Sequence, residues 1–115
     1  MKRLHLTERA LSDIDKIYTY SIERWSQSVA DRYLDDLNEA LRRLDQDLVL
    51  FEFRPKFSGR LHFYRAQKHV FIGDVIKDVG YVLAVWHGSM DFIERLSKLE
   101  PLLIQEVELM AKRVE

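Results

Sequence analysis

The stretch that organises the chain is residues 81–87, which read Tyr-Val-Leu-Ala-Val-Trp-His. It is apolar through Trp86 and lacks the polar–apolar alternation of a strand with one face in water. Such a run is typical of an inner strand that is covered on both faces. Gly88 and Ser89 interrupt the pattern, because these residue types favour turns and helix caps. We therefore expect residues 81–87 to form a central strand of a small sheet.

Three further segments, all earlier in the chain, favour strands. Residues 61–65 and 70–76 are rich in aromatic and β-branched residues, which pack well on a pleated sheet. Residues 2–6 alternate polar and apolar side chains, as a half-buried strand does. Residues 67–68 and 77–80 are predicted as hairpin turns, so the last three strands follow one another in antiparallel order.

A helical hairpin is predicted between the first strand and the others. Thr7 can cap a helix whose apolar residues recur every three or four positions and end near Trp25. A second stripe spans residues 30–48, and either Ser26 or Ser28 can cap its helix. Coiled coils show the same stripe, but this one lasts under three heptads, which favours packing on the core. The short connection between the two helices predicts an antiparallel pair.

The chain is predicted to end in two helical segments. Residues 90–98 form a short helix capped by Ser89, and Asp91 in its first turn can pair with Arg95. Pro101 opens the second segment, because proline is tolerated in a first helical turn. The apolar stripe of that segment consists of Leu103, Val107, Met110 and Val114. It either packs on the core or forms an oligomer or partner surface, since an exposed apolar helix face is a liability.

These elements predict one α+β domain over residues 1–115, with a core over residues 3–98 and a helical extension over residues 100–115. A length of 115 residues is sufficient for one hydrophobic core. With 47% apolar and 32% charged residues, the composition is that of a globular protein, neither disordered nor membrane-spanning. The absence of cysteine excludes a disulfide scaffold, a cysteine-bound zinc ion and a thiol nucleophile. The first residues lack a long apolar stretch, so we expect no secretory signal.

Positive charge is concentrated in one part of the chain. The net charge is −1, but residues 53–73 contain five lysines and arginines and no acidic residue, namely Arg54, Lys56, Arg60, Arg65 and Lys68. Residues 49–60, which overlap this segment, hold Pro55 and Gly59 and are predicted to form a loop. The charge either attracts an anionic partner or protects a loop and an edge strand from aggregation. The near-neutral total argues against broad, non-specific DNA binding.

No standard catalytic motif is present, because the P-loop, the dinucleotide-binding glycine pattern and the HExxH zinc motif are all missing. His62 and His69 can approach across a hairpin, but a polar cross-strand pair is a simpler interpretation than a metal site. We therefore expect no metal and no cofactor. His87 ends the central strand, where it can act as a general acid or base near neutral pH. Alternatively, its ring satisfies backbone groups at the turn, which is the more common role.

Three short runs occur in a characteristic order. They are Lys-His-Val-Phe-Ile at residues 68–72, Val-Trp-His-Gly-Ser-Met-Asp-Phe at residues 85–92, and Arg-Leu at residues 95–96. Together they resemble the RelE/ParE superfamily of toxins from type II toxin–antitoxin systems, and the Met-Asp-Phe with the following Arg-Leu is closest to the ParE branch. Residues 10–14, with Trp25 and Tyr33, resemble the helical hairpin of that family, so the likeness covers residues 3–98.

The resemblance implies a cytosolic bacterial toxin in which a helical hairpin packs on a small sheet. It also implies a cognate antitoxin whose C-terminal segment wraps around the toxin. ParE-like members inhibit DNA gyrase by binding, whereas RelE-like members cleave mRNA on the ribosome. The ribonuclease branch keeps catalytic Lys, Arg, Tyr or His after its last strand, where this chain has Met90-Asp91-Phe92 and an acidic helix. We therefore favour inhibitory binding, with a ribosome-dependent endoribonuclease and a non-toxic interaction module as the alternatives.

Each interpretation assigns different roles to the candidate residues. The partner surface of a binder would consist of Arg54, Lys56, Arg60, Arg65, Lys68, His87, Asp91 and Arg95. A nuclease would use His87 as acid or base, with Arg60 and Arg65 on the phosphate. We expect no membrane partner and no specific DNA binding, and a homodimer or a higher toxin–antitoxin assembly is left open. Two features depart from the family. Gly73 lies where many relatives have a tyrosine. Residues 100–115 extend past the usual end of the family, and they either add a helix, support a dimer or occupy part of the antitoxin's surface.

Overall fold

A five-stranded sheet forms the centre of the fold in the computed structural model, which describes residues 3–89 and 91–114. Its strands are β1 (Leu4–Leu6), β2 (Glu52–Phe53), β3 (His62–Ala66), β4 (His69–Ile76) and β5 (Val79–His87). Their order across the sheet is β1-β5-β4-β3-β2. β1 is parallel to β5, and all other neighbours are antiparallel. The apolar run that predicts a central strand belongs to β5, whose residues 81–86 are all buried.

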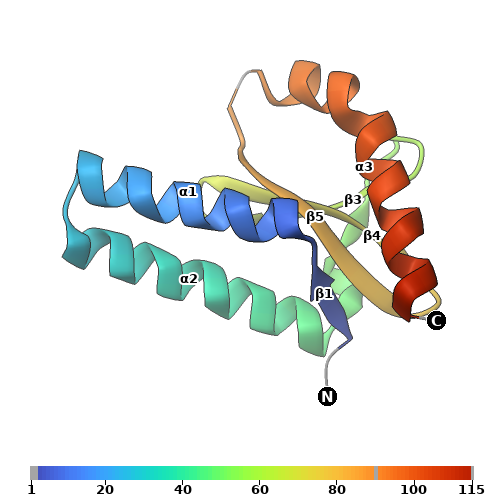
Figure 1. Cartoon of the computed structure of the whole chain (residues 1–115), viewed down its shortest axis with the longest axis horizontal. Helices are drawn as coiled ribbons and strands as arrows, with labels where there is room; N and C mark the ends of the chain where they lie inside the picture. The colour runs from blue at the N-terminus through green and yellow to red at the C-terminus, as the bar shows by residue number, and fades with distance from the viewer. Residues whose placement is uncertain (1–2, 90, 115) are drawn as a thin grey trace.

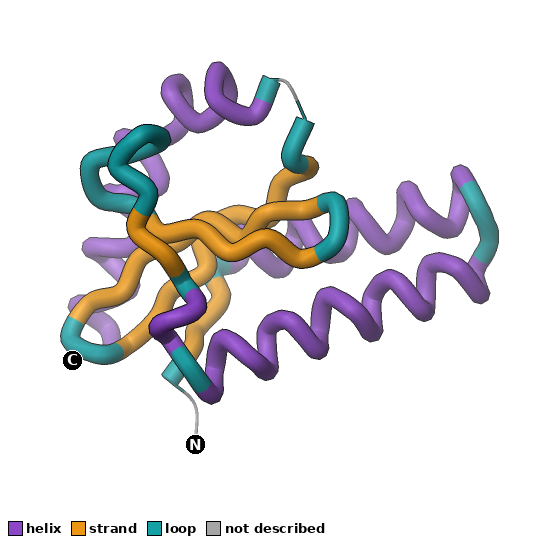
Figure 2. The backbone as a smooth tube through the Cα atoms, turned by 180° about the vertical axis from the view of Figure 1, so that it is seen from behind, coloured by secondary structure: helices purple, strands orange, loops and turns teal. Residues whose placement is uncertain are grey.

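Helices cover both faces of this sheet. One face carries the hairpin of α1 (Glu8–Arg24) and α2 (Gln27–Gln46), and the other carries α3 (Phe92–Val114). Figure 1 shows the hairpin on one side of the strands and α3 on the other, and Figure 2 shows the same layers from behind. The predicted α+β architecture is therefore confirmed. Within the described residues, no helix is long and apolar enough to cross a membrane.

Two apolar clusters fill the spaces on either side of the sheet. The cluster under the hairpin includes Ala10, Leu37, Leu44, Phe71 and Val82. The cluster under α3 includes Ile72, Leu83, Trp86, Leu103 and Val107. Since β5 contributes side chains to both clusters, its uninterrupted apolar sequence is explained.

A β-bulge at Leu83 decides which side chains of β5 face each cluster. Ile72 pairs with Ala84 and Gly73 pairs with Val82, so Leu83 has no partner in β4. As a result, Leu83 and Ala84 both face α3, whereas strict alternation would have turned one of them toward the hairpin.

Side-chain caps fix the starts of the first two helices. Thr7 Oγ1 accepts a hydrogen bond from the Ala10 N–H at 3.1 Å, as predicted. Ser26 caps α2 by accepting from the Val29 N–H at 3.1 Å. The alternative cap, Ser28, is wrong, because the connection is so short that Ser28 already lies in the first turn of α2.

The predicted loop at residues 49–60 is wrong in its first part. This part contains the end of a 3-10 turn, η1 (Leu48–Leu50), followed by β2, which pairs with the start of β3. Asp47 begins the turn by accepting a hydrogen bond from the Val49 N–H at 3.2 Å. A two-residue strand is too short to produce a periodic pattern, which is why the sequence does not reveal it.

The two predicted C-terminal helices are one helix. α3 continues through Pro101, although proline lacks the N–H donor of a helix interior and crowds the preceding turn. The helix bends between its two halves (Figure 1), as proline-containing helices do. Buried leucines on either side of Pro101 hold both halves against the sheet. The first predicted strand begins at Lys2 and the predicted short helix begins at Met90, and both of these residues lie outside the described ones. The side chain of Val114, predicted for the last apolar stripe, is not described either.

Gly73 lies where β4 is in close contact with β5 and with a buried ring. A Cβ atom at this position would lie 1.8 Å from the Tyr81 carbonyl oxygen and 2.6 Å from Phe51 Cζ. Neither the strand backbone nor the buried ring can move away freely, so only glycine fits. A larger side chain, tyrosine included, cannot be accommodated at this position.

Gly73→Ala should lower the free energy of unfolding by about 1–3 kcal/mol, because the added methyl group overpacks a closed site. Gly59→Ala is the control, since no atom lies within 4 Å of a Cβ there. The control should change the stability by less than about 0.5 kcal/mol. Urea denaturation followed by circular dichroism measures both variants. Equal stability of the two would contradict the close packing at Gly73.

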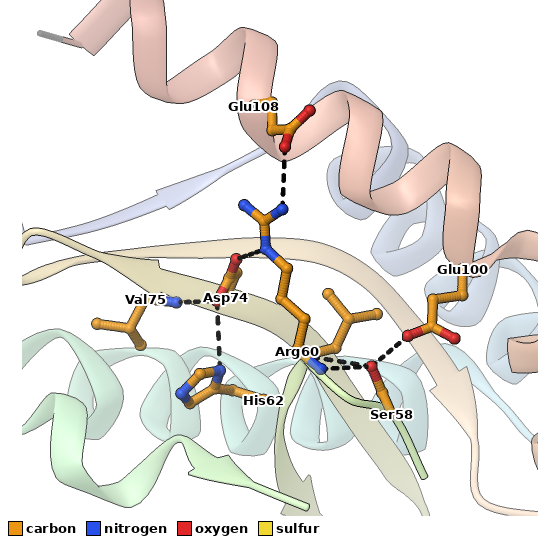
Figure 3. A network of polar contacts seen from close by, with 8 residues as sticks. Ser58, Arg60, His62, Asp74, Val75, Glu100 and Glu108 are labelled. Atoms are coloured by element: carbon orange, nitrogen blue, oxygen red, sulfur yellow. Dashed lines mark hydrogen bonds and ion pairs between the residues drawn. The ribbon is translucent and has the colours of Figure 1, made fainter. Parts of the chain in front are cut away.

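Asp74 is the centre of a polar network that joins β4 to α3 (Figure 3). It is 4% exposed, and its carboxylate accepts hydrogen bonds from Arg60 Nε and from the Val75 N–H, both at 2.8 Å. His62 Nδ1 lies 3.4 Å from the same carboxylate, and Arg60 continues to Glu108 of α3 at 3.0 Å. Burial alone would raise the pKa of Asp74, but these donors lower it below its ordinary value of 3.8.

Asp74→Asn should lower the free energy of unfolding by about 1–3 kcal/mol at neutral pH, because it removes the buried charged partner of Arg60. Since the pKa of Asp74 is lowered by folding, its stabilisation is complete above its ordinary value of 3.8 and is lost as the pH falls through the folded-state pKa. Thermal denaturation at neutral and acidic pH should therefore show a weaker acid sensitivity in the variant. Asp78→Asn, in an exposed turn, is the control. An unchanged acid sensitivity in Asp74→Asn would contradict this account of the network.

Candidate functional site

β2 covers only part of the outer edge of β3. It pairs with His62 and Phe63, so within the described chain residues 64–66 have a strand partner on the β4 side alone. Unpaired backbone groups at a strand edge can hydrogen-bond to an additional strand. The edge at residues 64–66 is therefore a place where an extended peptide can bind.

The opposite edge of the sheet is partly closed by side chains of α1, of its N-cap and of α2. Asp45 of α2 accepts hydrogen bonds at 2.7 and 2.9 Å from two backbone N–H groups, one just before β1 and one at its start. Beyond β1, Thr7 donates to the Leu83 carbonyl at 3.2 Å, and Asp13 accepts from the Val85 N–H at 3.0 Å. Burial raises the pKa of Asp13, even though this hydrogen bond and the neighbouring cations oppose the shift. This edge is therefore far less able to accept a further strand.

A groove of about 390 Å³ runs along the open edge of β3. Its lining residues, called the β3 groove below, are Leu50, Glu52, Arg54, Phe57, Phe63, Tyr64, Arg65 and Val70. Phe57 stands edge-on to Phe63, with ring centroids 5.4 Å apart, and is itself 42% exposed. Leu50 is also exposed. These side chains form an apolar hollow that can bury an apolar side chain of a partner.

Arg65 gives the groove an uncompensated positive charge. It is exposed, its Nε donates to a backbone carbonyl of the β3–β4 turn at 3.1 Å, and it forms no ion pair within residues 3–89 and 91–114. Its guanidinium lies against Gly88, where a Cβ atom would be 2.8 Å from Nη1. Lys68 in the adjoining turn is exposed as well, whereas Arg54 is paired with Glu52 at 2.5 Å. The positive end of the groove is thus at Arg65 and can bind a carboxylate or a phosphate.

Arg95 extends this positive surface onto α3. Arg65, Val70 and Trp86 pair in one row across three strands. The Arg95 guanidinium lies over the Trp86 ring, 4.4 Å from the ring centroid, in a cation–π contact. Arg65 and Arg95 therefore lie on either side of Val70, which lines the β3 groove.

Lys56 and Asp91, the other predicted partner residues near this region, lie outside the β3 groove. Lys56 is exposed in the connection between β2 and β3. A hydrogen bond from Ser89 is the main reason why the pKa of Asp91 is lowered, and the charge of Arg95 contributes less. The predicted ion pair between Asp91 and Arg95 does not form in the described chain, because Arg95 is directed to Trp86.

Arg60 and His87 lie at opposite ends of β3. The Arg60 guanidinium, before the start of the strand, is bound to Asp74 and Glu108. His87 lies level with the other end, since it pairs with His69, the partner of the last residue of β3. A strand rises about 3.3 Å per residue, so these two ends are on the order of 13 Å apart. The structure therefore brings Arg65 to the His87 end but leaves Arg60 away from it, and the residues predicted for a nuclease are not assembled.

His87 lies beside His69 on the neighbouring strand. The predicted approach of His62 to His69 is wrong, because His69 pairs with His87 and His62 lies at the other end of β3. The rings of His69 and His87 have centroids 5.4 Å apart. Tyr33 Oη forms a 2.5 Å hydrogen bond with His69 Nδ1 and accepts one from the Lys68 N–H. Burial, followed by the electrostatic effect of the neighbouring His87 ring, lowers the pKa of His69 to about 4, so His69 is neutral at physiological pH.

The sequence analysis does not predict three residues of this region as part of the site. Leu50 and Phe57 are apolar residues in a segment predicted to be a loop, and that mismatch is the signal that points to them. Tyr33 belongs to the apolar stripe of α2, where only its hydroxyl distinguishes it from a core residue. Among the described residues, no group of three or more His, Asp or Glu side chains can hold a metal ion.

Comparison with known proteins gives the family. The chain matches the model of the ParE toxin of the type II toxin–antitoxin system parDE over residues 4–92, whereas no curated protein sequence matches it. Its fold is similar to a solved structure described as the chromosomal ParDE toxin–antitoxin system from P. aeruginosa, with a TM-score of 0.68 and 19% sequence identity. The likeness covers 77% of this chain and 98% of that chain. Because the family match spans most of its length, the chain belongs to the ParE toxin family of type II toxin–antitoxin systems.

Proposed function

We propose that this protein is the toxin of a bacterial type II toxin–antitoxin pair. It acts in the cytoplasm by binding DNA gyrase and is neutralised by a cognate antitoxin. Membership of the ParE family supports the toxin role, and the gyrase target rests on the resemblance to the ParE branch. The separation of Arg60 from His87 favours binding over RNA cleavage. A nuclease needs its acid, its base and its cations around one phosphate.

The β3 groove is proposed as the binding site for the antitoxin. The open edge at residues 64–66 offers backbone hydrogen bonds to an extended segment. The hollow beside Phe57 accepts an apolar side chain, and Arg65 accepts an acidic one. The observation that carries this proposal is the unpaired charge of Arg65 next to an unpaired strand edge. This combination favours an acidic peptide in an extended conformation.

Arg65→Glu should weaken binding of the antitoxin encoded beside this gene by about 10- to 100-fold, or about 1.4–2.8 kcal/mol. The substitution places a like charge against the acidic segment. Isothermal titration calorimetry measures the affinity. Lys112→Glu makes the same change in charge at the exposed end of α3, away from the groove, and should leave the affinity unchanged. An equal loss in both variants would indicate general attraction between opposite charges and would argue against this site.

Expression of the toxin without its antitoxin should stop DNA synthesis before protein synthesis, and the purified protein should inhibit DNA supercoiling by gyrase. His87→Ala should reduce this inhibition by far less than the roughly 100- to 10,000-fold that loss of a general acid or base costs. Labelled-precursor uptake and a supercoiling assay provide the measurements. An early stop in protein synthesis, with mRNA cut at ribosomes and rescue by His87→Ala, would establish the nuclease alternative instead.

A further inference from the structure

α3 covers the apolar face of the sheet opposite the α1–α2 hairpin. The side chains buried between the helix and the strands include Ile72, Leu83, Trp86, Leu96, Leu103 and Val107. Leu103 and Val107 are fully buried. Detachment of the helix would expose this whole face to water, so α3 is part of the core.

Three glutamates of α3 attach the helix to two other parts of the chain, α1 and the segment before β3. The contacts are Glu100 with Ser58, Glu106 with Arg9 and Glu108 with Arg60. The contact with Arg9 of α1 is bidentate, at 3.0 and 3.2 Å. Figure 3 shows the other two, where the segment before β3 reaches the helix. Because Glu106 and Glu108 lie after Pro101, the second half of the bent helix is held as well as the first.

Most of this helix lies beyond the part of the chain that matches the family. The ParE match ends at residue 92, where α3 begins. The likeness to the ParDE structure covers 98% of that chain but 77% of this one. Residues 93–114, which follow the family match, fill a face of the sheet from within the same chain. A helix from a partner cannot occupy that face while α3 is bound to it.

The first turns of α3 also shape the β3 groove. Phe92 contacts Phe57 and Phe63, with ring centroids 6.1 and 6.2 Å apart, and both of these rings line the groove. Arg95 is held over Trp86 next to the groove. If α3 left the sheet, the apolar hollow would lose the ring that supports its wall.

We infer that α3 stays bound to the sheet when the antitoxin binds. It thereby closes one face of the toxin to partners and restricts the antitoxin to an extended segment in the β3 groove. This inference rests on the proposed function for the identity of the partner. It assigns the C-terminal extension a role in selecting how the antitoxin binds.

A cross-link between α3 and α1 tests whether the helix must move. The natural chain has no cysteine, so Arg9→Cys combined with Glu106→Cys provides a unique pair of thiols for a short bis-maleimide. The cross-linked protein should bind the antitoxin encoded beside this gene within about twofold of the uncross-linked double variant. A loss of about tenfold or more on cross-linking would overturn the inference, provided that each single-cysteine variant treated with the same reagent still binds. Failure of the natural protein to bind this antitoxin would instead refute the proposed function.

Hydrogen exchange of the free protein gives a second test that needs no partner. Amides of α3 near Leu103 and Val107 should exchange as slowly as the central amides of β5, because both open only when the protein unfolds globally. Exchange in α3 about 100-fold faster than in β5 would show that the helix detaches by itself, and this result would overturn the inference. In the complex with the antitoxin, the same α3 amides should keep their protection.

Discussion

β5 is apolar on both faces, and the other elements of the fold keep water away from both of them. A strand of this kind needs a layer on each side of the sheet. Its neighbour β1 is parallel to it, which requires a long crossover connection, and the α1–α2 hairpin forms part of that connection and also the first layer. β3 and β4 return by tight turns, and α3 provides the second layer. The bulge at Leu83 then distributes the side chains of β5 between the two cores.

Periodicity in the sequence predicts the elements whose side chains repeat over many residues, and these include α1, α2 and the three strands β3, β4 and β5. Periodicity does not predict the elements that depend on contacts between residues far apart in the sequence. β2 contains two residues, too few for a pattern, and exists because the start of β3 pairs with it. Pro101 would end a helix in an isolated peptide, but burial of the leucines on either side continues it. The bulge at Leu83 has no local signal, because it is a property of the pairing between two strands.

The same limit applies to the candidate site. Counting charges locates the cations but not their partners. Arg60 and Arg65 lie in the same basic segment, and nothing in the sequence distinguishes their roles. In the structure, Arg60 binds carboxylates that lie 14 and 48 residues away in the sequence, whereas Arg65 contacts no carboxylate in the described chain. Part of the basic segment is thus neutralised inside the protein, and the attraction for an anion is concentrated at one end of β3. The hollow beside Phe57 is likewise visible only after folding, because it is built from three separate stretches of the chain.

Asp45, Thr7 and Asp13 have a consequence for assembly. They occupy four backbone groups at the β1 side of the sheet, so a further strand is accepted far more readily at β3 than at β1. A molecule that accepts a foreign strand therefore offers no equivalent edge to the next molecule. Strand-mediated association is thus favoured at one edge of each molecule, which favours a pair over a filament. Three side chains, one of them the cap of α1, thereby favour specific recognition over aggregation.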